Sequence, residues 1–205
     1  SVYYRLLEIK NNTLFPGDQD LYPGEYVIDI AKNILKKNKF SNFDNYDLIF
    51  NDLKSSCIEE AMNLIKNDLK KLGIVHDNFV SENYIVNQKL VEKALDFLKK
   101  KNYVYEGILE KPKGNEVDDW EPRKQILFQS TKFGDDADRA LKKSDGSWTY
   151  FANDVAYHLN KIERKFDLLI NVLGADHAGY LKRQASCVSA LSENKQQIIS
   201  KVCQL

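Results

Sequence analysis

Cysteine is scarce in this sequence of 205 residues, and the three cysteines lie far apart. Cys57, Cys187 and Cys203 form no Cys-x-x-Cys pair, and an odd number of cysteines is a poor basis for a disulfide framework. We interpret all three as small apolar residues of the protein interior. Because disulfides persist in oxidising compartments, their expected absence favours a reducing one, and we expect a cytoplasmic protein.

Long apolar runs and an excess of one charge are absent as well. No segment approaches the ~20 consecutive apolar residues that a membrane-spanning helix needs. Lys plus Arg number 30 and Asp plus Glu number 30, so the formal net charge is zero. Proteins that bind nucleic acid by themselves usually carry a net positive charge or a basic stripe. The composition therefore predicts a globular protein with no membrane partner, and it does not by itself indicate nucleic acid.

Several common site motifs are missing. The sequence contains neither Gly-x-Gly-x-x-Gly nor Gly-x-x-x-x-Gly-Lys-Ser/Thr, which excludes the common phosphate-binding loops. No serine lies in a Gly-x-Ser-x-Gly elbow. The three histidines, His76, His158 and His177, lack the spacing of a zinc site.

Three aspartates gather just before Arg139, at positions 135, 136 and 138. Such a cluster could suggest Mg²⁺ or Ca²⁺, but the alternating ligands and distal Glu of a calcium loop are absent. We therefore predict a turn in which Arg139 pairs with a carboxylate, and we expect no metal site.

Hydrophobic periodicity predicts a mixture of helices and strands. Ser56 and Glu59 have the spacing of a capping box, which predicts a helix that starts there. Asp145-Gly146 predicts a hairpin turn. The predicted helices cover about 1–10, 25–36, 56–72, 91–98, 153–164 and 181–191. The predicted strands cover about 103–109, 125–130, 139–143, 148–151 and 166–173, with extended chain at 74–80 and 84–86 and a loop at 110–123.

The last third of the chain indicates the fold class. Phe166–Leu173 is nearly continuously apolar, which is typical of a strand buried in a parallel sheet. A predicted helix, with Asn153 as its N-cap, precedes this strand, and another follows it. An α-β-α order of this kind is typical of a doubly wound α/β sheet.

The turn after the apolar strand is the first candidate site. In open α/β sheets ligands bind outside the carboxyl ends of the strands, and Gly174, Asp176 and His177 occupy that place. Gly174 would let a ligand approach the backbone, and the two polar side chains would lie at a helix N-terminus. The alternative is structural: Asp176 caps the next helix and His177 lies on the surface.

Tyr150 and Asp154 form the second candidate site, four residues apart at the expected strand-to-helix turn. A carboxylate beside a phenol suits a cationic ligand, because Asp154 supplies charge and Tyr150 a ring face or a hydroxyl. The alternative is an aspartate favoured by the helix dipole and a tyrosine of the core. For His158, four residues further along, we expect a structural role.

Four ordered motifs resemble bacterial arginyl-tRNA synthetases, which are class I aminoacyl-tRNA synthetases. The segments near the N-terminus fit the same family, so the resemblance spans essentially the whole chain. The segments that carry it are Phe128–Arg139, Lys143–Gly146, Thr149–His158, Gly174–Tyr180, Ser1–Arg5 and Tyr22–Ala31.

The resemblance implies an α/β fold: a Rossmann-like class I catalytic domain with a parallel sheet and helices on both faces, interrupted by an α+β connective insertion. It places residues 1–56 in the first half of the nucleotide-binding fold plus a linker. Residues 57–147 would be the connective insertion, and 148–205 would open the second half.

The same resemblance implies a reaction. The family joins arginine to ATP, with Mg²⁺ as part of the co-substrate, and transfers arginine from arginyl-adenylate to tRNA(Arg). On this reading Tyr150, Asp154 and His177 bind arginine, while Gly174 and Asp176 line the nucleotide side of the pocket. The parent enzyme is expected to be a monomer.

The family's His-x-Gly-His and Lys-Met-Ser-Lys-type elements do not occur in these 205 residues. Both ends of the sequence have the pattern of cuts in a longer chain, so we expect a fragment that lacks the catalytic groups and is inactive by itself. A non-catalytic binding or scaffold module with a synthetase-derived fold is the alternative. A synthetase for another amino acid is disfavoured by the pair of Tyr150 and Asp154.

Overall fold

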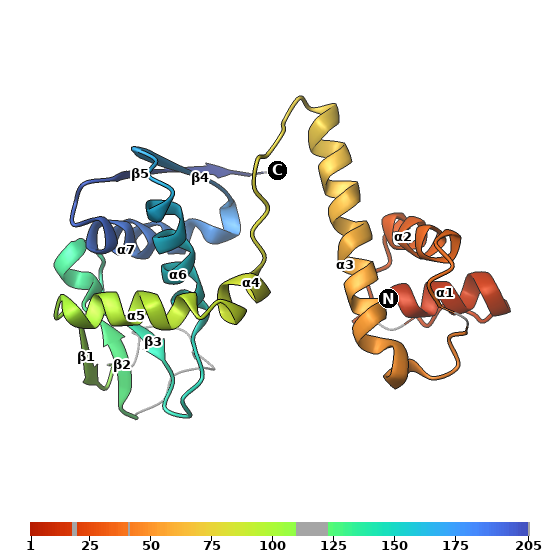
Figure 1. Cartoon of the computed structure of the whole chain (residues 1–205), viewed down its shortest axis with the longest axis horizontal. Coiled ribbons are helices and arrows are strands. Elements are labelled where there is room, and N and C mark those ends of the chain that lie inside the picture. The colour runs from red at the N-terminus through yellow and green to blue at the C-terminus, as the bar shows by residue number, and fades with distance from the viewer. Residues whose placement is uncertain (18–19, 41, 110–122, 205) are drawn as a thin grey trace. The chain divides into compact units, whose positions relative to one another are not determined.

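The computed structural model describes residues 1–17, 20–40, 42–109 and 123–204, and its contacts divide the chain into two compact units (Figure 1). The first unit is Ser1–Asn78 and the second is Phe79–Leu205. Most of the loop predicted at 110–123 lies outside the described residues. In the part that the structure describes, no helix is both long and apolar enough to span a membrane.

The first unit contains three helices, α1 (Val2–Asn11), α2 (Glu25–Lys36) and α3 (Tyr46–Lys71). The bounds of α2 agree with the predicted helix, and its apolar residues Val27, Ile30, Ala31 and Ile34 are buried. The last three of these side chains pack with Leu6 of α1 and Leu53 of α3 into a small core. The helical prediction for the N-terminal segment is confirmed by α1.

The prediction that a helix starts at Ser56 is wrong, because α3 starts ten residues earlier. Asn45 caps it, since its side chain accepts a hydrogen bond from the Leu48 amide. Ser56 therefore lies inside the helix, where it is buried together with Glu60. Two apolar residues of α3, Ile58 and Ile65, are instead exposed. The core-facing side of α3 carries polar residues, which the hydrophobic pattern could not identify.

The helices of the second unit are α4 (Glu82–Asn87), α5 (Leu90–Lys100), α6 (Tyr150–Glu163) and α7 (Leu181–Ser192). Two 3₁₀ segments, η1 (Ser130–Phe133) and η2 (Ala175–Tyr180), accompany them. The extended chain predicted at 84–86 is wrong, because Ser81 caps α4 by accepting a hydrogen bond from the Tyr84 amide. The predictions of α5 and α7 are confirmed.

A three-stranded antiparallel sheet supports the start of α6. Its strands, in sheet order, are β1 (Val104–Gly107), β2 (Gln125–Phe128) and β3 (Arg139–Lys142). The predicted turn at Asp145-Gly146 is confirmed, because the Gly146 amide donates to the Lys143 carbonyl and Trp148 pairs with Lys142. The strand predicted at 148–151 is wrong beyond that bridge, because α6 has already begun at Tyr150.

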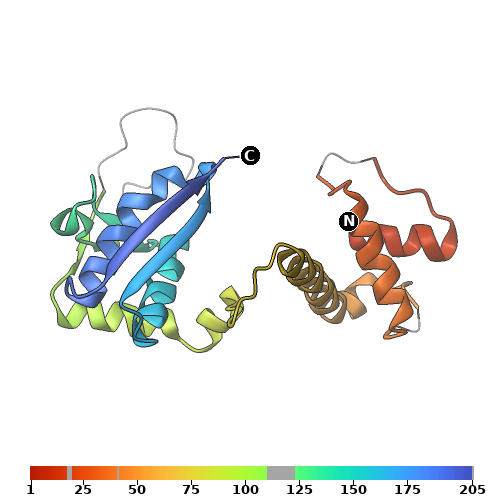
Figure 2. The ribbon, with the colours of Figure 1, turned by 90° about the horizontal axis from the view of Figure 1, so that it is seen from above.

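A parallel pair of strands, β4 (Leu168–Gly174) and β5 (Gln197–Cys203), forms the second sheet. Figure 2 shows the two strands side by side along one side of the unit. In β4 burial alternates: Leu169 and Asn171 are buried, whereas Ile170 is 59% and Val172 is 70% exposed. The described residues thus form an α/β fold in which this sheet has one covered face.

The cysteine prediction holds only in part. Cys187 is buried in the core of the second unit and Cys57 is half-buried, but Cys203 at the end of β5 is exposed. No disulfide forms among them. The sequence of β5 does not indicate that Cys203 is exposed, because the exposure of a strand residue depends on which elements cover the sheet.

Candidate functional site

Thr149 fixes the start of α6, the helix that carries Tyr150 and Asp154. Its hydroxyl accepts a hydrogen bond from the Ala152 amide and donates one to the Ala140 carbonyl of β3, at 3.2 and 2.8 Å. The predicted cap, Asn153, is wrong: it lies within the first turn of the helix. Because Thr149 bonds to both elements, the antiparallel sheet sets where the helix begins.

Tyr150 and Asp154 lie one helical turn apart on the same side of α6, as their spacing of four requires. Both line a cavity of about 340 Å³, within the size range of small-molecule sites. Tyr150 is 84% exposed, so it is not a tyrosine of the core. The cavity is lined by Val80, Ser81, Glu82, Ile85, Tyr150, Asn153, Asp154 and Tyr157.

Glu82 supplies a second carboxylate to this cavity, and sequence reasoning missed it. Its Oε1 accepts a hydrogen bond of 2.7 Å from the Asn153 side chain, which ties α4 to α6. Glu82 and Asp154 are 72 positions apart in the sequence, so no local motif connects them. Only the capping serine before Glu82 indicated a helix start at this position.

The pKa of Asp154 is raised above its usual value, first because burial disfavours the charged carboxylate. The neighbouring negative charge of Glu82 acts in the same direction. Lys161, Arg183 and His177, in that order, act in the opposite direction and favour the ionised form. The cavity therefore presents a partly desolvated carboxylate, for which a cationic ligand would be a further stabilising partner.

A buried polar network lies behind Asp154 and joins α6, β4 and α7. His158 is 2% exposed, and its Nδ1–H donates to the Asp154 backbone carbonyl at 2.8 Å. The Asn171 amide group donates to His158 Nε2 and to the Gln184 side chain, at 3.3 and 3.1 Å. Lys161 donates to Asn171 Oδ1 at 3.1 Å. These bonds confirm the predicted structural role of His158.

Burial lowers the pKa of His158 to about 4, and the nearby positive charge of Lys161 adds to the effect. The hydrogen bond to the Asp154 carbonyl opposes it. At neutral pH the ring is therefore neutral, with its proton on Nδ1 and a free lone pair on Nε2. This tautomer matches the two partners of the ring, because the Asp154 carbonyl accepts from Nδ1–H and the Asn171 amide donates to Nε2.

Gly174, Asp176 and His177 lie where the sequence placed them, at the carboxyl end of β4. They are not among the residues that line the Asp154 cavity, although His177 acts electrostatically on Asp154. His177 Nε2 lies 3.4 Å from Asp176 Oδ2, and both side chains are largely exposed. A Cβ at Gly174 would overlap Asp176 Oδ1, so the absence of a side chain lets Asp176 fold back there. The capping alternative is not what the structure shows, because Tyr180 is the N-cap of α7.

The aspartate cluster forms the predicted turn with its ion pair. Arg139 holds Asp135 through two hydrogen bonds of 2.7 Å, and Ser130 donates a third to the same carboxylate. Burial acts to raise the pKa of Asp135, but these donors outweigh it and hold the pKa at about 2. Among the described residues, no group of three or more His, Cys, Asp or Glu side chains could hold a metal ion.

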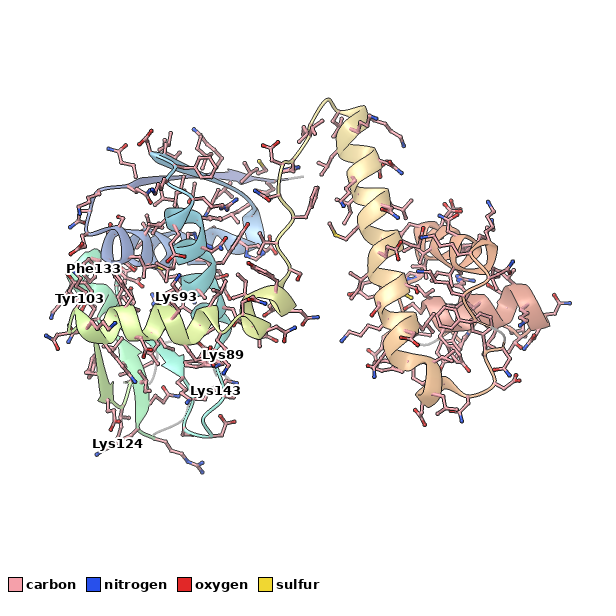
Figure 3. All side chains as sticks on the ribbon, in the orientation of Figure 1. Lys89, Lys93, Tyr103, Lys124, Phe133 and Lys143 are labelled. Atoms are coloured by element: carbon pink, nitrogen blue, oxygen red, sulfur yellow. The ribbon has the colours of Figure 1, made fainter. Side chains whose placement is uncertain are left out.

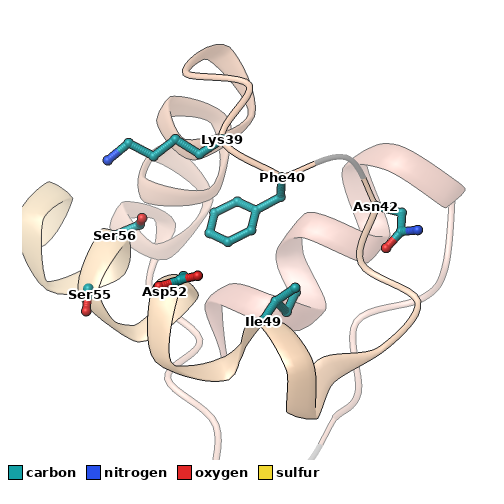
Figure 4. A pocket seen from close by; sticks show the side chains of 7 residues that line it. All are labelled: Lys39, Phe40, Asn42, Ile49, Asp52, Ser55 and Ser56. Carbon is teal, nitrogen blue, oxygen red and sulfur yellow. The ribbon is translucent and has the colours of Figure 1, made fainter.

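The first unit has a cavity of its own, of about 540 Å³, between the end of α2 and the start of α3 (Figure 4). The Phe40 ring lies over Asp52 and Ile49 there (Figure 4). None of the residues predicted to act in binding lines it. With Lys39 and Asp52 as its charged lining residues, it shows no concentration of one charge.

Curated proteins that match the chain point to one activity. Arginine–tRNA ligase of Pelagibacter ubique (strain HTCC1062) is 54% identical over 206 residues, which cover 100% of this chain and 36% of that relative. Arginine–tRNA ligase of Ruegeria sp. (strain TM1040) is 45% identical over 211 residues, covering 100% and 35%. The chain thus spans roughly a third of the length of these relatives. No protein-family model matches it.

A solved structure agrees with these relatives. A crystal structure from Campylobacter jejuni, assigned as an arginyl-tRNA synthetase, superimposes with a TM-score of 0.73 at 26% identity. The match covers 100% of this chain and 43% of that one.

The fold and these relatives show that the chain is similar to part of an aminoacyl-tRNA ligase. Over its whole length it corresponds to a segment of the arginine–tRNA ligases.

Proposed function

We propose that the Asp154 cavity binds the substrate arginine of an arginine–tRNA ligase, which joins arginine to ATP and transfers it from arginyl-adenylate to tRNA(Arg). The observation that carries the proposal is the convergence of two carboxylates, Asp154 and Glu82, on one cavity beside Tyr150. The family supports the choice of ligand, because the curated relatives are arginine–tRNA ligases.

Arginine suits this lining chemically. A guanidinium group is planar and permanently charged, and its N–H donors form paired, charge-assisted hydrogen bonds with carboxylates. Asp154 is the partly buried carboxylate of the pair and Glu82 is the more exposed one. The two carboxylates can therefore accept hydrogen bonds from different N–H groups of one guanidinium. The Tyr150 ring or hydroxyl provides a further contact over the cationic group.

The nucleotide side is assigned to Gly174 and Asp176 at the end of β4, with His177 on the arginine side. ATP brings Mg²⁺ as part of the co-substrate. The described residues present no carboxylate cluster that would hold the ion by themselves. The proposed setting is a Rossmann-like core, with residues 1–56 and 148–205 in its two halves and 57–147 inserted between them. In this chain α3 continues without a break through 56–57.

The longer enzyme is proposed to act as a cytoplasmic monomer, and the 205-residue chain to be inactive by itself. The sequence lacks the His-x-Gly-His and Lys-Met-Ser-Lys-type elements that serve the phosphates of ATP in this family. Arginine-dependent exchange of pyrophosphate into ATP measures activation directly. We expect none from this chain and turnover from the longer enzyme.

Replacing Asp154 by Asn tests the arginine site in the longer enzyme. The amide keeps the shape but loses the charge, so we expect the KM for arginine to rise at least tenfold, with a smaller change for ATP. Glu163→Gln is the matched control: it lies on the same helix, and its ion pair is with the surface residue Lys93. Equal arginine KM values for the Asp154 variant and the parent would refute the assignment.

A further inference from the structure

Asn171 is a polar residue in the middle of β4, an otherwise apolar strand. It lies on the covered side of the sheet together with Leu169, and it is 7% exposed. A buried amide costs free energy unless its donors and its acceptor are satisfied by hydrogen bonds. Arginine binding gives no direct reason for an amide at this position, because Asn171 does not line the Asp154 cavity.

The hydrogen bonds of Asn171 fix which way its amide group points. The amide nitrogen donates to His158 Nε2 and Gln184 Oε1, and the amide oxygen accepts from the Lys161 ammonium. Because an ammonium group can only donate, the oxygen must face Lys161 and the nitrogen must face the other two groups. An aspartate at this position would have no N–H to donate to either of them. The network therefore requires an amide and not a carboxylate.

Lys161 is held in place by two neutral groups. Its Nζ lies 3.1 Å from Asn171 Oδ1 and 4.4 Å from the centre of the Tyr157 ring, and Tyr157 lines the Asp154 cavity. A lysine has a long flexible stem, so without an acceptor in the interior its ammonium would turn towards water. Asn171 thus determines where this positive charge lies. A neutral amide does so without cancelling the charge, whereas a carboxylate would pair with it.

The place of this charge matters to Asp154, because burial raises the pKa of that carboxyl. Lys161 of the same helix has the largest opposing effect, followed by Arg183 of α7 and His177 of η2. Glu82 of α4 acts in the same direction as burial. If the Lys161 ammonium moved into water, burial and Glu82 would be less opposed. Asp154 would then take up a proton at a higher pH.

We propose that Asn171 is a positioning residue for arginine binding. It holds the ammonium of Lys161 beside the Tyr157 ring, and the fixed ammonium keeps Asp154 charged. Asn171 acts through Lys161, because it lies behind the cavity and does not touch a ligand there. The inference rests on the proposed function, since a cationic ligand is what makes the charge of Asp154 important.

The first measurement is a carboxyl ¹³C NMR titration of Asp154 in the 205-residue chain, which requires no ligand. Asn171→Leu keeps a similar side-chain volume but removes the acceptor for Lys161, so we expect the pKa of Asp154 to rise. Asn171→Asp should raise it at least as far, because the new carboxylate cancels the charge of Lys161. Asn171→Leu gives the answer by itself if the buried aspartate prevents folding.

A double variant shows whether Asn171 acts through Lys161. When Asn171→Leu is combined with Lys161→Met, the ammonium that Asn171 holds is already gone. Asp154 should therefore titrate in the double variant as it does in Lys161→Met alone.

Leu169→Ala is the matched control for loosened packing. Leu169 lies on the same covered side of β4 and is 5% exposed, so its truncation weakens the core without removing a polar contact. Lys93→Met is the control for charge, because Lys93 pairs with Glu163 near the end of α6, and Figure 3 shows it on α5. We expect the titration of Asp154 to stay unchanged in both controls.

The second measurement is the KM for arginine of the longer enzyme from pH 5.5 to 8.5, by arginine-dependent pyrophosphate exchange. In Asn171→Leu the acidic rise of this KM should begin at a higher pH. We expect an increase of at least threefold at pH 5.5 and of less than twofold at pH 8.5, where Asp154 is ionised in both proteins. The KM for ATP should show no such dependence on pH.

Four results would overturn the proposal: an unchanged titration of Asp154 in the Asn171 variants, additive effects of Asn171→Leu and Lys161→Met, an equal rise in either control, or an arginine KM that increases by the same factor at every pH. Failure of the proposed function is a separate result. It would appear as an unchanged arginine KM in Asp154→Asn, while the NMR titration would still decide whether Asn171 acts on Asp154 through Lys161.

Discussion

Lys161 is the residue whose charge matters most for the state of Asp154. Among the groups that counter the effect of burial it has the largest effect, ahead of Arg183 and His177, while Glu82 acts in the opposite direction. Lys161→Met removes this favourable charge, so we expect the pKa of Asp154 to rise further. A carboxyl ¹³C NMR titration measures it directly. Lys182→Met, which removes a surface charge that pairs with Asp136, should leave the titration of Asp154 unchanged. An equal rise in the pKa of Asp154 in both variants would show that the total charge of the protein, and not Lys161 in particular, is responsible.

His158 predicts how the stability of the second unit depends on pH. Its pKa is about 4 in the folded chain and about 6.5 when unfolded, so the unfolded chain binds more protons between these values. Its contribution is therefore fully present above pH 6.5 and is lost as the pH falls towards 4, by roughly 3 kcal/mol in total. Urea unfolding at pH 7.5, 5.5 and 4.5 measures the loss. His158→Gln should flatten the dependence in this window, and an unchanged slope in the variant would assign the effect to other groups.

At the scale of the element, the start of α6 depends on a single hydroxyl. Thr149→Val keeps the shape of the side chain but removes both the cap and the bond to β3, so we expect a loss of about 1–2 kcal/mol in the free energy of unfolding. Chemical denaturation measures it, with Thr149→Ser, which retains the hydroxyl, as the control. Both variants losing the same stability would show that the methyl group, and not the hydroxyl, is important.

The bounds of helices whose apolar side faces the core could be predicted from the sequence. The bounds of helices that depend on polar contacts could not. The pattern in α2 and α5 gave their bounds, because their apolar positions are the buried ones. In α3 the buried side includes Ser56 and Glu60, and α6 starts where Thr149 bonds to a strand nine residues earlier in the sequence. Tyr150 and Asp154 were identified as a phenol and a carboxylate four residues apart at an expected strand-to-helix turn, and their role came from the family resemblance. Glu82 was not, since it reaches the cavity only through the packing of α4 on α6.

At the scale of the whole molecule, the chain is two units joined near Asn78 and Phe79. The link after α3 is irregular and its side chains are exposed, with Val75 at 79% and Phe79 at 44%. Exposed irregular segments are preferred sites of proteolysis. Limited proteolysis should therefore cut between 73 and 80 before it cuts within α5 or α6, as mass spectrometry of the first products would show. First cuts inside α6 would contradict this division of the chain.

The parallel pair of β4 and β5 has a consequence for handling the protein. Within the described residues each strand has one neighbour, so each also has an unpaired edge of backbone N–H and C=O groups. The uncovered face carries Leu168, Ile170, Val172 and Ile199, all more than 40% exposed. Open edges beside an apolar face are templates for adding strands from other molecules, and Lys201 is the one charged side chain in the two strands that opposes this. At high concentration, preparations of these 205 residues are therefore expected to form β-rich aggregates, and the practical remedy is a second charge on that face.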